Sequence, residues 1–173
     1  LDVCAYDLQG HHRDIIFTSG ATESINLAIK GVYRKYQNKG QHIVTQNTEH
    51  KAVLDTCAAM EQEGWRVTYL PADTDGFVSP QSVYDAIEKD TVLVTVMHAN
   101  NEIGTIQPVA EVGAICRQKN VFFMVDTCQS FGKLDIDVNE MNIDLMAATA
   151  HKIYGPKGVG FLYIRQRGPK VRL

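Results

Sequence analysis

Short apolar runs alternate with amphipathic stretches along this chain of 173 residues, and this alternation constrains the fold more than any other feature. The apolar runs have the length of β-strands and lie at residues 15–18, 42–46, 66–70, 92–97, 121–125, 145–149 and 160–164. The intervening stretches 22–39, 50–63, 80–89 and 108–119 carry apolar residues at helical spacing. Strands that alternate with such helices are typical of βαβ crossovers, and wholly apolar strands need cover on both faces. The sequence therefore predicts an α/β fold with a mainly parallel sheet.

Local signals mark the ends of several predicted helices. Ser79 is expected to cap a helix that starts at Pro80, because proline is favoured at the first helical position. Gly40 and Gly64 are expected to end two others. The predicted inward faces are Ile25, Ile29, Val32, Tyr33 and Tyr36; Val53, Leu54, Cys57 and Met60; and Val109, Val112, Ile115 and Cys116.

Composition and charge exclude several classes of protein. A net charge of −3 gives no reason to expect a nucleic-acid partner. No apolar run reaches the ~18 residues that a membrane helix requires. The cysteines Cys4, Cys57, Cys116 and Cys128 show no metal-ligand spacing, so no metal site is expected. Without a secretory signal or clustered cysteines, a reduced, cytoplasmic setting is favoured. All but Cys128 lie in apolar contexts and should be buried.

Polar clusters follow successive predicted strands, at residues 19–22, 50, 100–101, 126–129 and 149–152. Carboxyl ends of strands in an open α/β sheet meet at one edge, where ligands bind. We therefore expect these clusters to converge. Gly20 and Ala21 open a helix and leave room for an anion at its free N–H groups, although an ordinary cap by Ser19 or Thr22 is an open alternative.

Asp126 and Lys152 form the most informative pair among these clusters. Asp126 ends a buried strand, and Lys152 lies in a Gly/Pro-rich loop between two apolar runs. Pyridoxal phosphate needs such a pair, because a lysine holds its aldehyde as a Schiff base and an acid keeps its ring nitrogen protonated. A single loop lysine is more often a solvated charge, so the pair alone leaves both interpretations open.

The chain resembles the cysteine desulfurases, in the class V aminotransferase group of fold-type I pyridoxal phosphate enzymes. The motifs that carry the resemblance are SGATES at 19–24, TEHKAVLDTC at 48–57, NNEIGTIQP at 100–108 and AHKIYGPKG at 150–158. It implies a three-layer fold with a mainly parallel central sheet. Residues 1–173 would then be part of the large, cofactor-binding domain, and the small C-terminal domain and the loop with the catalytic cysteine would lie beyond this chain.

The resemblance also implies roles for individual residues. Lys152 would carry the cofactor and act as acid and base, and His50 would stack on the ring and assist proton transfer. Asp126 would pair with the ring nitrogen. The remaining contacts would be made to the ring oxygen by Asn101 and Gln129, and on the phosphate side by Ala21, Thr22, Thr149 and His151.

The activity that the resemblance implies is conversion of L-cysteine to L-alanine, with sulfur transferred as an enzyme persulfide. Expected partners are a second copy of the chain in a homodimer and sulfur-acceptor or iron–sulfur scaffold proteins. The setting would be cytoplasmic, or the mitochondrial matrix in a eukaryote. None of the four cysteines matches the family's nucleophile, so these residues alone are expected to be inactive. Alternatives are a selenocysteine lyase, an aminotransferase, or a binding module without turnover.

Overall fold

A computed structural model describes residues 8–168 and 170–173. Its centre is a seven-stranded sheet in the order β1-β7-β6-β5-β4-β2-β3. The strands are β1 (Ile15–Thr18), β2 (His42–Gln46), β3 (Arg66–Leu70), β4 (Thr91–Met97), β5 (Phe122–Asp126), β6 (Leu145–Thr149) and β7 (Gly160–Ile164). The pairs from β3 through β6 are parallel, whereas β7 is antiparallel to both of its neighbours. The predicted mainly parallel sheet is confirmed.

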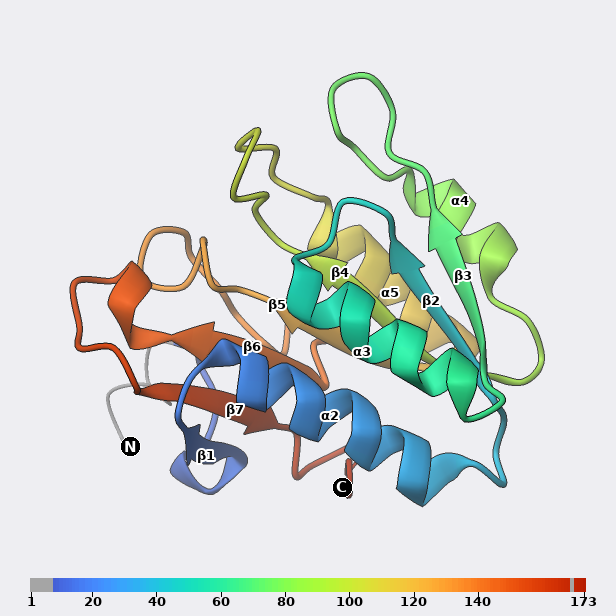
Figure 1. Ribbon diagram of the computed structural model, residues 1–173, viewed down its shortest axis with the longest axis horizontal. Helices are drawn as coiled ribbons and strands as arrows, with labels where there is room; N and C mark the ends of the chain where they lie inside the picture. The colour runs from blue at the N-terminus through green and yellow to red at the C-terminus, as the bar shows by residue number, and fades with distance from the viewer. Residues whose placement is uncertain (1–7, 169) are drawn as a thin grey trace.

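Helices cover both faces of the sheet and complete three layers (Figure 1). On one face α2 (Ala21–Tyr36) and α3 (Lys51–Gln62) pack together, with Ile25, Ile29, Val53 and Cys57 in their shared core. On the other face α4 (Pro80–Ala86) and α5 (Val109–Lys119) bury Val83, Val109 and Val112. The described residues also form two short 3-10 turns, η1 (His12–Asp14) and η2 (Ala150–Lys152). No helix among the described residues is long and apolar enough to cross a bilayer.

The predicted inward faces of the helices are largely confirmed, but a few of their side chains lie at the edge of the buried face. Tyr33, Tyr36, Leu54 and Ile115 are only partly buried. Ser79 caps α4 as expected, because its hydroxyl accepts the N–H of Gln81 at 3.2 Å.

Two helices end earlier than predicted. The chain leaves α4 before Ile87, which is buried in an extended conformation. Gly40 lies beyond the end of α2, and a side chain there would meet the Asp90 carbonyl oxygen at 2.0 Å. This glycine is therefore needed for a close passage of two chain segments.

The connection from β5 to β6 differs from a βαβ crossover, because it contains turns instead of a helix. Its apolar side chains Phe131, Ile136, Val138 and Ile143 are buried in the same core that α4 and α5 cover. They take the place of a helical face. The connection from β6 to β7, residues 150–159, includes η2 and Lys152 and reverses the chain direction.

Candidate active site

A cavity of about 430 Å³ lies at the carboxyl ends of the strands. It collects side chains from segments that follow β1, β2, β4, β5 and β6, because all these strands run in one direction. The structure therefore confirms the expected convergence. Every predicted site residue lines this cavity: Ala21, Thr22, His50, Asn101, Asp126, Gln129, Thr149, His151 and Lys152.

The start of α2 forms one wall and leaves backbone donors free. The first helical hydrogen bond runs from the Ser24 N–H to the Gly20 carbonyl, at 3.1 Å. The N–H groups of Ala21 and Thr22 therefore make no hydrogen bond to the described residues. Neither alternative cap is present, since Gly20 is the N-cap and no side chain caps the helix. Free N–H groups and the helix dipole make this end a suitable anion site.

Ser19 and Glu23 hold the loop before α2 in place. Both the backbone N–H and the hydroxyl of Ser19 donate to the Glu23 carboxylate, at 2.6 and 2.7 Å. These hydrogen bonds lower the pKa of Glu23, whose exposed side chain also lines the cavity.

Gly160 lets this wall approach the sheet. A side chain at Gly160 would lie 2.6 Å from the Gly20 Cα and 2.7 Å from the Ala148 carbonyl oxygen. Gly160 pairs with Thr18 of β1 and with Thr149 of β6, so it sits between the two strand ends. Because Gly160 has no side chain, the start of α2 and the end of β6 can come close enough to line the same cavity.

Thr149 and His151 form a pair on the next strand end. The Thr149 hydroxyl and His151 Nδ1 are 2.9 Å apart, and which atom donates depends on the imidazole tautomer. Thr149 is buried and His151 is exposed, so the buried hydroxyl orients the ring at the rim. Both residues line the same cavity as the start of α2.

Lys152 ends the η2 turn at the rim of the cavity. The N–H groups of Ile153 and Gly155 both donate to the Ala150 carbonyl, at 3.0 and 2.9 Å, and close the turn. The Lys152 side chain is exposed, and Nζ makes no hydrogen bond to the described residues. A fixed backbone therefore presents a free amine to the cavity.

Asp126 lies at the floor, at the end of β5, with 1% of its surface exposed. Its Oδ1 accepts the Cys128 N–H at 2.9 Å, and the carboxylate also interacts with the Cys128 thiol. Cys128 is half-buried and also lines the cavity. Burial and the nearby Asp126 carboxylate raise the pKa of its thiol, so it is protonated near neutral pH.

His50 is the N-cap of α3, and its Nδ1 accepts the N–H of Ala52 at 3.1 Å. In the neutral ring the proton is therefore on Nε2. The ring is exposed beside the cavity, where it can face a planar ligand or exchange a proton.

The two adjacent asparagines have separate roles. Asn100 accepts the N–H groups of Glu102 and Ile103 and donates to the Thr48 carbonyl, at 2.8, 3.0 and 3.0 Å. Its amide is therefore used to build the loop, and Asn101 alone lines the cavity. The sequence could not separate two neighbouring amides, because their difference arises from a contact with another strand end.

Sequence reasoning missed several residues of this site. Met97, Ala99, Lys157 and Gly158 also line the cavity. Met97 and Ala99 flank the end of β4, so their position at a strand end was the available signal. Glu49 is buried next to His50, and nothing in its local sequence distinguishes it from a surface carboxylate.

The other described cysteines do not line the cavity. Cys57 and Cys116 are buried as predicted, and Cys4 lies outside the described residues. Burial is the main cause that raises the pKa of both thiols, to about 12 for Cys57. These groups are packing residues in the two faces of the core.

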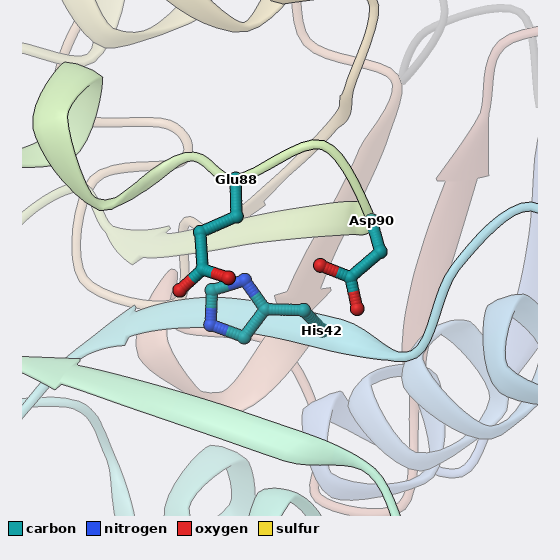
Figure 2. Close-up of side chains that lie close together, drawn as sticks. All are labelled: His42, Glu88 and Asp90. Atoms are coloured by element: carbon teal, nitrogen blue, oxygen red, sulfur yellow. The ribbon is translucent and has the colours of Figure 1, made fainter.

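Three possible metal ligands, His42, Glu88 and Asp90, lie close together (Figure 2). They are at the amino ends of β2 and β4, whereas the cavity is at the carboxyl ends. Their atoms already have partners. His42 Nδ1 and Nε2 bond to the hydroxyls of Thr91 and Thr68, at 2.7 and 2.9 Å. Arg66 pairs with both carboxylates, at 2.9 and 2.8 Å. These residues therefore form a hydrogen-bonded cluster that joins the amino ends of β2 and β4.

Comparison with known proteins identifies a family for this arrangement. The model for the aminotransferase class-V family matches residues 5–170. The chain is 54% identical to cysteine desulfurase IscS of Shewanella denitrificans over 96% of its own length and 41% of the relative. It is 58% identical to a probable mitochondrial cysteine desulfurase of Schizosaccharomyces pombe, over 93% of its length and 32% of the relative.

A solved structure described as SspA in complex with cysteine shares this fold, with a TM-score of 0.94 and 44% identity. The match covers 99% of this chain and 50% of that structure. The chain thus spans about a third to two fifths of the curated relatives' length.

Proposed function

Because the chain belongs to the aminotransferase class-V family, we propose that the complete protein is a pyridoxal phosphate-dependent cysteine desulfurase. It would convert L-cysteine to L-alanine and pass the sulfur on as a persulfide. Support comes from relatives that are 54% and 58% identical and are named as cysteine desulfurases. The described chain would supply the cofactor-binding part of the large domain.

The observation that carries this proposal is the position of Asp126 and Lys152 around one cavity. Asp126 presents a buried carboxylate with no cationic partner among the described residues, and Lys152 presents a free amine at the rim. The N–H groups at the start of α2 add an anion cradle. A protonated ring nitrogen, an aldehyde and a phosphate would each find a matching group, so the residues fit pyridoxal phosphate.

In the mechanism, the bound cofactor would act as an electron sink for bond cleavage at the substrate's amino carbon. Asp126 would hold the ring nitrogen protonated, and its burial would strengthen this electrostatic contact. Lys152 would bind the cofactor and move protons through Nζ. His50 would stack on the ring and donate or accept a proton at Nε2, because Nδ1 is held by the Ala52 N–H.

The remaining predicted residues would bind and orient. Ala21 and Thr22 would hold the phosphate at the start of α2, next to the paired side chains of Thr149 and His151. Asn101 and Gln129 would donate to the ring oxygen.

The persulfide would form on a thiol other than the three described ones. Cys57 and Cys116 are buried, and Cys128 is half-buried beside Asp126. Their raised pKa values keep them protonated, whereas attack on the substrate sulfur requires a thiolate.

The complete protein would form a homodimer and pass sulfur to acceptor or iron–sulfur scaffold proteins. Its compartment would be the cytoplasm, or the mitochondrial matrix as the name of the Schizosaccharomyces pombe relative suggests.

The test of the proposed function uses the complete protein with pyridoxal phosphate, L-cysteine and a reductant. Alanine and sulfide should both exceed the amount of enzyme. Turnover of selenocysteine alone would identify a lyase, transfer of the amino group would identify an aminotransferase, and bound cofactor without product would identify a binding module. Each of these three results contradicts the proposal.

Borohydride reduction followed by peptide mapping tests the cofactor-carrying residue. The label should lie on Lys152 and disappear in Lys152→Ala. Lys157→Ala is the matched control, because Lys157 lines the same cavity from the same loop. A label on any other lysine in the wild-type protein would overturn the assignment.

A further inference from the structure

Glu49 is a buried carboxylic side chain that the proposed mechanism does not use. It precedes His50 in the turn after β2, and 6% of its surface is exposed. Its Oε1 accepts the Met97 N–H through a short hydrogen bond. Its Oε2 is buried and forms no well-aligned hydrogen bond with the described residues, although the Gln46 side-chain amide lies near enough to favour the charged form. This side chain therefore joins the turn that carries His50 to the end of β4.

The contact brings two acidic side chains to neighbouring strand ends. Met97 is directly opposite Asp126 in the pairing of β4 with β5. Glu49 binds the backbone at Met97, so its carboxyl group lies one strand away from Asp126 and interacts with it electrostatically. Two unpaired negative charges in such a buried place would repel each other.

The surroundings of Glu49 favour its neutral form. None of the ion pairs within the described part of the chain involves Glu49. The Cys57 thiol on α3 also interacts with it but is itself protonated near neutral pH. Burial, followed by the charge of Asp126, raises the pKa of Glu49 well above its ordinary value, and the Met97 N–H and the Gln46 amide oppose this only in part.

We propose that Glu49 is a positioning residue that works as a neutral carboxylic acid. It fastens the His50 turn to the end of β4 and leaves Asp126 as the negative charge at the cavity floor. This inference rests on the proposed function, because the Asp126 charge would serve to stabilise a protonated ring nitrogen of the cofactor. A neutral acid also avoids the cost of an uncompensated charge on the buried Oε2.

The first test is infrared spectroscopy of the cofactor-free complete protein near neutral pH. The wild-type spectrum minus that of Glu49→Gln should contain the carbonyl band of a protonated carboxylic acid. Glu140→Gln, at an exposed position between β5 and β6, is the matched control and should produce no such band. A difference spectrum with only carboxylate bands for Glu49→Gln would overturn the proposal.

The second test measures pyridoxal phosphate affinity by absorbance titration. Glu49→Ala removes the acceptor of the Met97 N–H and should weaken binding about tenfold, as expected for a lost buried hydrogen bond. Glu49→Gln retains an acceptor and neutrality, so it should recover most of that loss. Equal losses in both variants would overturn the proposal.

These two tests separate this inference from the proposed function. Wild-type protein that binds no pyridoxal phosphate would refute the proposed function and, with it, the positioning role. The infrared result would then still decide whether Glu49 is neutral. Wild-type binding without the carboxylic acid band would refute the inference about Glu49 alone.

Discussion

Replacement of Glu49 by glutamine should change how the stability of the protein depends on pH. Burial and the nearby Asp126 raise the pKa of Glu49 in the folded protein above its ordinary value of 4.5. As the pH rises above that value, the unfolded chain releases this proton while the folded chain keeps it. The folded wild-type protein therefore loses stability with rising pH until Glu49 itself ionises, and Glu49→Gln removes this loss.

The size of the effect follows from the number of protons released. One proton bound only in the folded state lowers the free energy of unfolding by about 1.4 kcal/mol per pH unit. Between pH 5 and pH 7, Glu49→Gln should therefore gain up to about 2.7 kcal/mol relative to the wild type. Altered packing and hydrogen bonding of the glutamine add an offset, but this offset is constant with pH.

The assay is urea denaturation of the cofactor-free complete protein at pH 5, 6 and 7. The difference in unfolding free energy between Glu49→Gln and wild type should increase at each step. Glu140→Gln should instead differ from wild type by a constant amount, because its side chain lies in water in the folded state as well. A constant difference for Glu49→Gln too would show that the buried carboxyl is already ionised at pH 5 and would refute the reasoning.

Further variants test the cavity itself. Asp126→Asn should retain bound cofactor but slow turnover at saturating cysteine by about 10²-fold or more, and unchanged turnover would exclude its role at the ring nitrogen. Cys128→Ala should keep most sulfur transfer, and loss of the protein-bound persulfide with cofactor still bound would contradict this. Gly160→Ala should lower the unfolding free energy by roughly 1–3 kcal/mol, because its Cβ would lie 2.6 Å from the Gly20 Cα. Equal urea midpoints and slopes for this variant and wild type would contradict that close packing.

Much of the fold was predictable from local patterns in the sequence. The strands at 15–18, 42–46, 66–70, 145–149 and 160–164 have the predicted bounds, because apolar runs and their period depend on residues close in the chain. The grouping of the cavity residues was also predictable. Parallel strands place their carboxyl ends together, so polar residues that follow such strands must meet.

Packing between distant segments decided the rest. The connection between β5 and β6 covers the sheet with turns, since Phe131, Ile136 and Val138 pack into the core without forming a helix. Asn100 and Asn101 have different roles, because only Asn100 donates a hydrogen bond to the Thr48 carbonyl.

Glu49 shows most clearly what the tertiary structure alone determines. In the sequence it is one acidic residue beside His50, with no local sign of burial. Its neutral state depends on enclosure at the end of β4 and on Asp126, which is 77 positions away in the numbering. The sequence determines which groups can ionise, but the desolvation and the neighbouring charges that set their protonation exist only after the strands have paired.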